Sequence, residues 1–294
     1  MSESAASRST PTRIGVVGCG LMGSGIAEVT ARAGLDVVVV EADEAASKAG
    51  RGRIESSLST GLDRGKLEAA DMEAALGRIA YATDPGQLAD RELVIEAVVE
   101  DEAAKVAVFE RVDREVESAD AILASNTSSI PIMKLAMATR RPEAVVGMHF
   151  FNPVPVLALV ELVPSLLTGE PTIERSERFV TEVLGKRVIR SQDRAGFVVN
   201  ALLIPYLLSA IRMLESGFAT ADDIDAGMVE GCAHPMGPLR LTDLIGLDTT
   251  MAVAESLYEE FKEPLYAAPP LLSRMVDAGL LGRKTGRGFY DYHR

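Results

Sequence analysis

A glycine pattern near the start of the chain constrains its fold more than any other feature. A short β-branched run, Arg13–Val17, leads directly into the sequence GCGLMG at residues 18–23. A helical pattern follows and stops at Gly34, and a second strand pattern at residues 35–40 ends in Glu41. The order of strand, G-x-G-x-x-G, helix, strand and acid is typical of a βαβ unit that binds a dinucleotide.

Each glycine of this pattern has a physical reason. Gly18 is expected to make the tight turn, Gly20 to let the backbone approach a pyrophosphate, and Gly23 to let the helix pack closely on the strand. The first helical residues, Leu21 and Met22, lie where backbone N–H groups and the positive end of the helix dipole face the phosphates. The alternative is a glycine-rich turn in an α/β protein that binds no ligand.

Glu41 indicates which dinucleotide is preferred. It lies 18 positions after Gly23, where an acid accepts hydrogen bonds from the adenosine ribose diol. Its charge would repel a 2′-phosphate, and Arg32 is the only nearby cation upstream. The sequence therefore predicts NAD as the cofactor, with NADP less favoured.

The rest of the chain predicts two domains after a disordered tail at residues 1–12. Strand patterns at 93–99, 121–124 and 145–148 alternate with helical ones, and a charged helical stretch at 45–77 has a break near Gly61 and Gly65. We expect an α/β Rossmann-type domain at 13–195, with a doubly wound, mostly parallel sheet. From Gly196 onward the pattern changes, and residues 196–294 predict an all-helical domain.

Polar residues follow several of these strands. Glu100 comes after the strand at 93–99, SNTSS at 125–129 follows the next, and His149 comes directly after the strand at 145–148. Ligands bind beyond the carboxyl ends of parallel strands, so these groups are expected on one edge of the sheet. The run 125–129 fits a turn and helix cap, but its surplus side chains, including Asn126 and Ser128, are candidates to hold a substrate oxygen or the nicotinamide amide.

His149 and Glu161 are two ionisable residues in apolar surroundings, 12 positions apart. Each needs a partner if buried, and a hairpin through the proline-rich turn at 152–155 would bring them together. A carboxylate that orients a histidine and favours its protonated form makes a general-base pair. The alternative is a buried histidine held by a structural salt bridge.

Composition and charge argue against several other classes of protein. The formal net charge is −13 with no basic stripe, so nucleic acid is not an expected partner. The two cysteines, Cys19 and Cys232, have no paired spacing, which favours a reducing compartment and predicts no metal site. The N-terminus lacks a signal-peptide core, and the longest apolar stretch, 197–211, is too short and polar to span a membrane. We expect a cytoplasmic protein.

Several stretches together resemble the L-3-hydroxyacyl-CoA dehydrogenases, most closely the short bacterial form called 3-hydroxybutyryl-CoA dehydrogenase. The resemblance runs from about Arg13 to Tyr292. The stretches that carry it are GCGLMGSGIA (18–27), VIEAVVED (94–101), SNTSSI (125–130), GMHFFNPVPVLALVEL (147–162), GFVVNALLIPYLLSAI (196–211), HPMGPLRLTDLIGLDTT (234–250) and GRKTGRGFYDY (282–292).

The resemblance implies a role for each matching residue. His149 matches the catalytic base and Glu161 the acid that pairs with it. The other matches are Ser128 and Asn200 for the substrate oxygens, Gly18, Gly20, Gly23, Glu41, Glu100, Lys105 and Lys284 for the cofactor, and Ser57 and Arg64 for the acyl-CoA. Arg64 departs from the family pattern, because relatives often carry lysine there.

The resemblance also implies a homodimer through the helical domain, an acyl-CoA substrate in the cleft between domains, and hydride transfer between a 3-hydroxyacyl-CoA and NAD. Two alternatives stay open: a same-fold dehydrogenase of another hydroxy acid, such as a sugar acid, or a crystallin-like relative; and an NAD-binding sensor without catalysis. Acyl chain length, physiological direction and pathway are not determined by the sequence.

Overall fold

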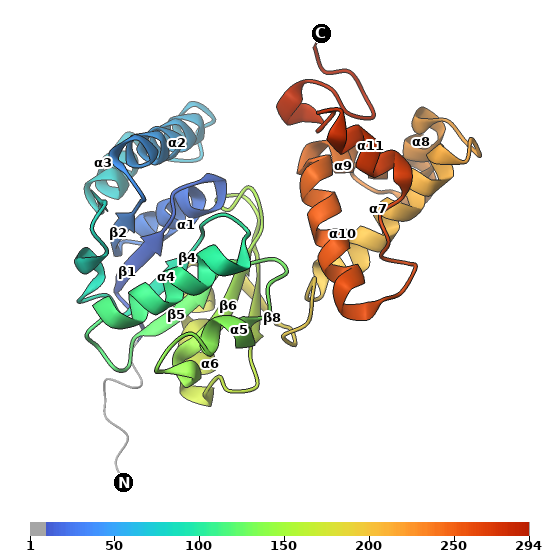
Figure 1. Ribbon diagram of the computed structural model, residues 1–294. Helices are drawn as coiled ribbons and strands as arrows, with labels where there is room; N and C mark the ends of the chain where they lie inside the picture. The colour runs from blue at the N-terminus through green and yellow to red at the C-terminus, as the bar shows by residue number, and fades with distance from the viewer. Residues whose placement is uncertain (1–9, 294) are drawn as a thin grey trace. The chain divides into compact units, whose positions relative to one another are not determined.

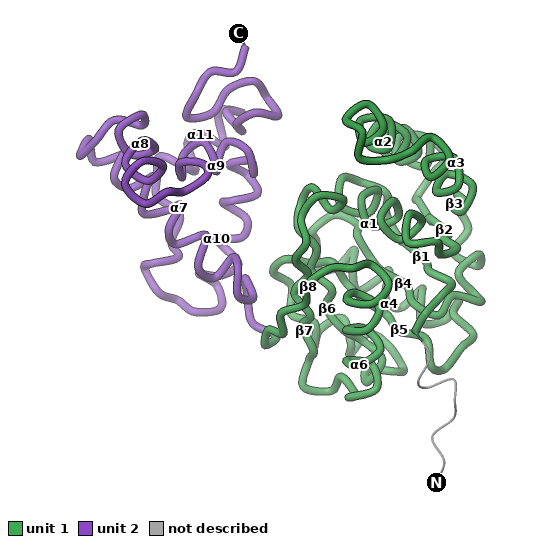
Figure 2. The backbone as a smooth tube through the Cα atoms, turned by 180° about the vertical axis from the view of Figure 1, so that it is seen from behind, with its two compact units in different colours: residues 1–193 green, residues 194–294 purple. Residues whose placement is uncertain are grey.

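The computed structural model describes residues 10–293, and these form two compact units. The first extends to Asp193 and the second begins at Arg194 (Figure 2). Most of the expected N-terminal tail, residues 1–9, lies outside the described residues. Thr12, by contrast, donates backbone and side-chain hydrogen bonds of 2.7 and 3.0 Å to Glu92 just before the first strand.

The first unit is built on one eight-stranded sheet (Figure 1). The strands are β1 (Arg13–Val17), β2 (Asp36–Val40), β3 (Ile79–Ala82), β4 (Leu93–Glu96), β5 (Ile122–Ser125), β6 (Val145–Phe150), β7 (Leu159–Pro164) and β8 (Arg187–Arg190). Their order is β3-β2-β1-β4-β5-β6-β7-β8, and all neighbours are parallel except β6 and β7. The chain runs from β1 through β2 to β3 at one edge and then returns past β2 and β1 to β4, which pairs with β1 on its other side. The predicted doubly wound, mostly parallel sheet is therefore confirmed.

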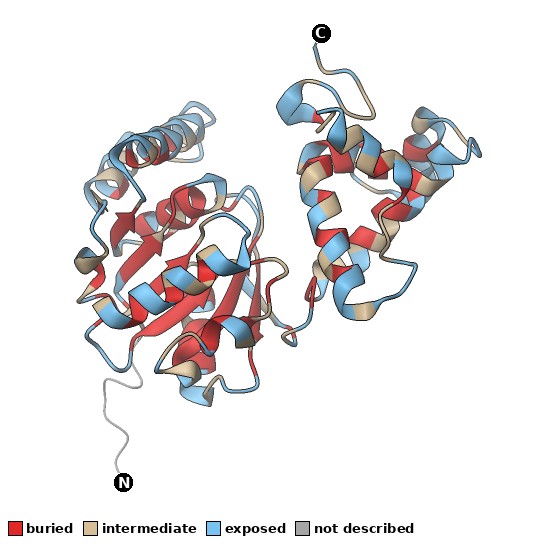
Figure 3. Ribbon diagram, viewed as in Figure 1, coloured by how far each residue is buried: buried red, intermediate tan, exposed pale blue. Residues whose placement is uncertain are grey.

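Helices cover both faces of this sheet. They are α1 (Leu21–Arg32), α2 (Glu44–Asp63), α3 (Ala69–Gly77), α4 (Glu102–Glu115), α5 (Ile132–Ala136) and α6 (Glu170–Arg178), with short turns η2 (Pro85–Leu88), η3 (Pro142–Ala144) and η4 (Phe179–Val183). One core joins α1 and α2 to the sheet through residues such as Ile26, Ile54 and Ile95. On the other face, Phe109 of α4 packs near Leu123. Figure 3 shows the strands buried between these layers.

The structure corrects some predicted boundaries. The strand expected at 93–99 ends at Glu96, so the apolar residues that follow belong to a loop and Glu100 lies four positions past the strand. Strands β3 and β8 were not predicted, because each has four residues with little alternation. The predicted break in the long helical stretch is confirmed, since α2 ends at Asp63 and α3 begins at Ala69.

The second unit is helical, as predicted. Its elements are α7 (Val199–Glu215), α8 (Ala221–Cys232), α9 (Pro238–Ile245), α10 (Leu247–Phe261), α11 (Pro270–Asp277) and the turn η5 (Arg283–Thr285). Its separate core includes Leu208, Leu239 and Leu257. Across residues 10–293, no helix is both long and apolar enough to cross a bilayer.

Candidate active site

His149 and Glu161 are direct partners in the antiparallel pair of β6 and β7. The imidazole Nδ1 lies 2.7 Å from Glu161 Oε2, and the two side chains are 9% and 0% exposed. The predicted hairpin through the proline-rich turn is therefore confirmed. Because Nδ1 faces the carboxylate, Nε2 is the ring nitrogen on the opposite side of the imidazole.

The surroundings of His149 are largely apolar. The ring of Phe151 lies with its centroid 4.6 Å from that of the imidazole, at an interplanar angle of 58°. All six residues of β6 are buried. A dry, low-dielectric setting strengthens the interaction between the imidazole and the carboxylate.

The glycine loop has the geometry that a bound dinucleotide requires. Gly18 adopts φ +89°, and a Cβ on Gly23 would lie 1.9 Å from the Gly18 carbonyl oxygen, so α1 packs directly on the turn. At Gly20 a Cβ would meet no atom of residues 10–293 within 4 Å. No described side chain caps the start of α1, and its first turn has no acidic residue. The loop therefore offers open space and uncapped N–H groups, which fit a pyrophosphate.

Glu41 follows β2 at the same edge. Its carboxylate accepts hydrogen bonds from the backbone N–H of Cys19 and, at 3.1 Å, from that of Ala42. Burial and the charge of Glu41 raise the pKa of the Cys19 thiol to about 12, against the lowering effect of Arg53. The predicted ribose-binding acid is thus anchored to the glycine loop, with its charge beside the start of α1.

Glu100 holds the predicted loop at 125–129. One carboxylate oxygen accepts hydrogen bonds from Thr127 Oγ1 at 2.5 Å, from the Ser128 N–H at 2.8 Å and from Ser128 Oγ at 3.3 Å. Burial would raise the pKa of Glu100, but Lys105 and the hydrogen bonds from Thr127 and Ser128 outweigh it and hold the pKa below its ordinary value. Asn126 is tied to the neighbouring strand, because its Oδ1 accepts from the N–H of Phe150 at 2.9 Å.

Lys105 is buried in the protein, whereas a residue that contacts a cofactor is expected at an accessible surface. It is only 1% exposed, and its ammonium lies 2.6 Å from Glu96 Oε1 and 3.2 Å from Glu100 Oε2. Glu96 was missed by the sequence analysis. A signal was available, because it is the one acid inside the apolar run LVIEAVV, and a buried acid requires partners.

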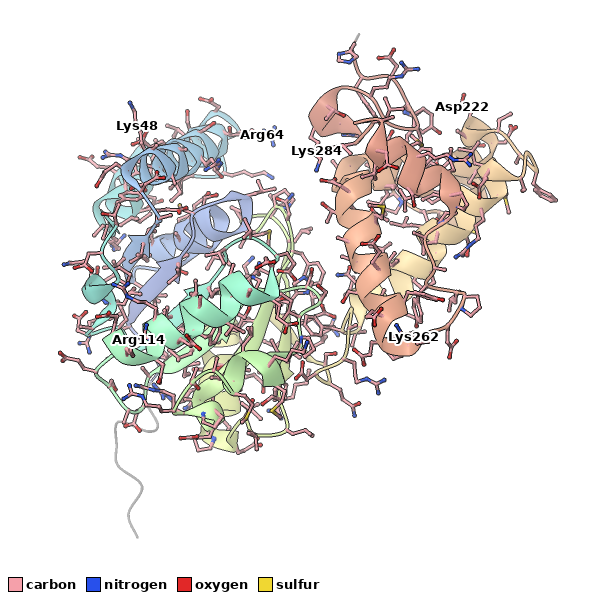
Figure 4. All side chains as sticks on the ribbon, viewed as in Figure 1. Lys48, Arg64, Arg114, Asp222, Lys262 and Lys284 are labelled. Carbon is pink, nitrogen blue, oxygen red and sulfur yellow. The ribbon has the colours of Figure 1, made fainter. Side chains whose placement is uncertain are left out.

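Ser57 lines a cavity of about 540 Å³ between α1, α2 and the turn at 152–155. Arg53 and Glu28, also missed by sequence, line the same cavity. Burial raises the pKa of Glu28 against the opposing effects of Ser57 and Arg32. Arg64 is not among the lining residues and lies exposed at the C-terminal end of α2 (Figure 4).

Two predicted residues belong to the second unit. Asn200 is the second residue of α7 and is partly buried. Lys284 lies in η5, where its ammonium is 2.6 Å from Asp248 Oδ2 (Figure 4). Their expected contacts with substrate and cofactor stay predictions.

Two family models match the chain in succession. The NAD binding domain of 3-hydroxyacyl-CoA dehydrogenase matches residues 13–194, and the C-terminal domain of 3-hydroxyacyl-CoA dehydrogenase matches residues 196–292. The two matches leave out little beyond the first residues of the chain.

Individual proteins are similar over nearly the whole chain. A 3-hydroxybutyryl-CoA dehydrogenase of Mycobacterium tuberculosis is 61% identical over 280 residues, which cover 95% of this chain and 98% of the relative. The crystal structure of M. tuberculosis FadB2 has a TM-score of 0.96 at 60% identity and covers 97% of this chain and 100% of that one. The (S)-3-hydroxybutyryl-CoA dehydrogenase PaaH1 from Ralstonia eutropha has a TM-score of 0.91 at 46% identity, with the same coverage.

These matches confirm the resemblance predicted from the sequence. The glycine loop, the two matched domains and the high identity over the whole length agree with one another. The chain therefore belongs to the 3-hydroxyacyl-CoA dehydrogenase family and is a nicotinamide-dependent dehydrogenase.

Proposed function

We propose that this enzyme interconverts (S)-3-hydroxybutyryl-CoA and acetoacetyl-CoA, with His149 as the general base in oxidation and the general acid in reduction. The observation that carries the proposal is the 2.7 Å contact between His149 Nδ1 and Glu161 Oε2 in a buried setting. Oxidation of a secondary alcohol needs a base within hydrogen-bond reach of the hydroxyl proton. An imidazole anchored by a carboxylate meets that need.

The geometry supports a separate role for each of the two residues in this proposal. Nδ1 is committed to Glu161, so Nε2 is the nitrogen that takes the hydroxyl proton. The charge of Glu161 stabilises the imidazolium that forms. Ser128 and Asn200 would hold the substrate oxygen on the carbon that reacts. When bound, the nicotinamide ring accepts the hydride in oxidation and returns it in reduction.

NAD is the cofactor that the site favours over NADP. Gly18, Gly20 and Gly23 shape the loop for the pyrophosphate, and the N–H groups of Leu21 and Met22 lie at the start of α1. Glu41 places a negative charge where a 2′-phosphate would have to lie. We expect NADH to be used in clear preference to NADPH.

The acyl-CoA is the proposed substrate because the closely similar relative is a 3-hydroxybutyryl-CoA dehydrogenase. Ser57 in the cavity beside α1 and the cation of Arg64 would contact the CoA portion. Arginine can meet a phosphate as well as lysine can, although with a planar, two-pronged geometry.

We further propose a homodimer formed through the helical unit. Large apolar side chains are exposed on it, including Leu202 at 73% and Phe218 at 80%. Exposed apolar groups of this size are typical of surfaces that bind another protein. The molar mass in solution, measured by light scattering after gel filtration, tests this: a dimer supports it and a monomer contradicts it.

Steady-state kinetics test the proposed activity. The absorbance of NADH is followed with acetoacetyl-CoA, with longer 3-ketoacyl-CoA substrates, with keto forms of sugar acids, and with NADPH in place of NADH. We expect the highest kcat/KM with acetoacetyl-CoA and NADH. Faster turnover of a sugar acid would indicate another hydroxy-acid dehydrogenase, and NADH binding without turnover of any substrate would indicate a sensor.

A further inference from the structure

We propose that Glu96 is a positioning residue: its carboxylate, acting through Lys105 and Ser125, fixes the shape of the loop that carries Ser128. The proposal rests on the function proposed above in one respect, namely that Ser128 holds a substrate oxygen. None of the roles assigned above includes Glu96.

Glu96 occupies a central place on the sheet. It is the last residue of β4, and its register partners are Val17 of β1 and Ser125 of β5. Val17 directly precedes Gly18, and Ser125 begins the loop at 125–129. Glu96 therefore lies between the dinucleotide loop and the predicted substrate loop, at the crossover point of the sheet.

Both oxygens of the Glu96 carboxylate accept hydrogen bonds. Oε1 accepts hydrogen bonds from Lys105 Nζ at 2.6 Å and from the Val98 N–H at 2.7 Å, and Oε2 accepts from Ser125 Oγ at 2.6 Å. The side chain is 2% exposed. At this burial it acts through the groups that it binds and not by touching a ligand.

The side chains that Glu96 binds connect it to the loop at 125–129. Four successive backbone N–H groups donate to side-chain oxygens of Ser125, Glu100 and Thr127, at distances between 2.8 and 3.3 Å. The four donors are Thr127, Ser128, Ser129 and Ile130. The loop thus takes its shape from this set of side chains, and Glu96 fixes two of them, Ser125 directly and Glu100 through Lys105.

The buried ion pair is poorly explained by stability alone. A buried pair of this kind gains little over apolar residues of similar volume, because both charges lose their hydration. Lys105 lies between Glu96 and Glu100, so Glu96 supplies a second anion that keeps the ammonium from being drawn wholly toward Glu100. Glu100 can then keep its other oxygen on Thr127 and Ser128.

The variant Glu96→Gln tests this arrangement. Glutamine has the same size, but its one oxygen can meet Lys105 while its NH₂ group faces Ser125 Oγ, which must then accept instead of donate. We expect amide hydrogen exchange at residues 127–130 to accelerate by at least about tenfold, as a lost charge-assisted hydrogen bond implies. We expect kcat with acetoacetyl-CoA to fall about 10- to 100-fold while KM changes less than about threefold, the pattern of a misplaced catalytic loop.

Asp113→Asn is the matched control. Asp113 is also a buried carboxylate, and it lies on the same helix as Lys105, eight residues further along α4. It forms ion pairs with Arg140 and Arg141. We expect it to lower Tm while leaving kcat and the exchange at 127–130 unchanged. An equal acceleration of exchange in this control would show a general loosening of the fold and would overturn the proposal.

Ser125→Ala is the second variant, and it tests the positioning role if Glu96→Gln does not fold. It removes only one hydroxyl, and we expect the same direction of change in exchange and in kcat. The proposal is contradicted if Ser125→Ala, or a folded Glu96→Gln, has the same exchange rates at 127–130 and the same kcat as the wild type. If the wild type does not turn over acetoacetyl-CoA but exchange at 127–130 still accelerates in these variants, the proposed function is wrong and the positioning role of Glu96 is still supported.

Discussion

His149 and Glu161 face one another across β6 and β7 as direct register partners, with Nδ1 2.7 Å from Oε2. The register itself fixes the pair, because a slip of one residue would turn the two side chains to opposite faces of the sheet. The hairpin thus holds the imidazole of His149 in one orientation beside the carboxylate of Glu161.

Glu161→Gln should lower kcat by about tenfold or more, yet less than loss of the imidazole does. The amide has nearly the same shape, but it carries no charge to balance the imidazolium, and its NH₂ group can donate to Nδ1 and force the wrong tautomer. The measurement is kcat at saturating acetoacetyl-CoA and NADH across about pH 6–9. An unchanged pH–rate profile with unchanged kcat would count against the pairing.

Gly20→Ala and Gly23→Ala should behave in opposite ways. At Gly20 the added methyl group meets open space, so the fold should persist while the NADH Kd rises by at least about tenfold, because the methyl group intrudes on the pyrophosphate. At Gly23 the methyl group would meet the Gly18 carbonyl oxygen at 1.9 Å, so the protein should be destabilised. Fluorescence titration with NADH and thermal unfolding check both, and normal NADH binding in Gly20→Ala would remove that loop from the cofactor site.

Asp113→Asn should lower stability at neutral pH by about 1–3 kcal/mol. Burial would raise the pKa of Asp113, but the hydrogen bonds from Arg140 and Arg141 outweigh it and hold the pKa below its ordinary value. A depressed pKa means that the stabilisation is complete above the unfolded value, about 3.9, and is lost as pH falls through the folded value. The Tm difference between wild type and variant should therefore stay constant from about pH 7 to 5 and shrink below about pH 4. A Tm difference that grows as the pH falls would contradict a lowered pKa for Asp113.

Cys19 should resist alkylation in the folded protein. Its thiol is buried and its pKa is raised to about 12, so the reactive thiolate is nearly absent at neutral pH, whereas Cys232 is exposed. Iodoacetamide followed by mass spectrometry should label Cys232 alone in the native state and both thiols after denaturation. Cys232→Ser serves as the control and should show no native labelling; rapid labelling of Cys19 would contradict the burial.

The features that the sequence predicted well were those with a strong local signal. The glycine loop has its own spacing rule, and the hairpin of His149 and Glu161 was predictable because two ionisable residues in apolar runs flank a proline-rich turn. The separation into a sheet and a helical unit follows from a change in hydrophobic period. These signals depend on near neighbours along the chain.

What the sequence did not predict depends on contacts between distant segments. The run LVIEAVV gives no local reason for β4 to end at Glu96, since the apolar residues continue past it. Past the strand, the backbone N–H of Val98 donates to the Glu96 carboxylate, and this carboxylate also binds Lys105 and Ser125, 9 and 29 positions away. Arg53 and Glu28 were missed for a similar reason, because the cavity that they line forms only when α1 and α2 pack together.

The measurement that tests the central claim most directly is the turnover of His149→Ala. Acetoacetyl-CoA reduction is followed by NADH absorbance in wild type and variant, with the NADH Kd and Tm measured for both to show that the cofactor site and the fold are intact. We predict that kcat falls by at least about 10²-fold while NADH binding is retained, as expected when the group that transfers the proton is lost. Near-normal turnover in a folded, NADH-binding His149→Ala protein would contradict the account.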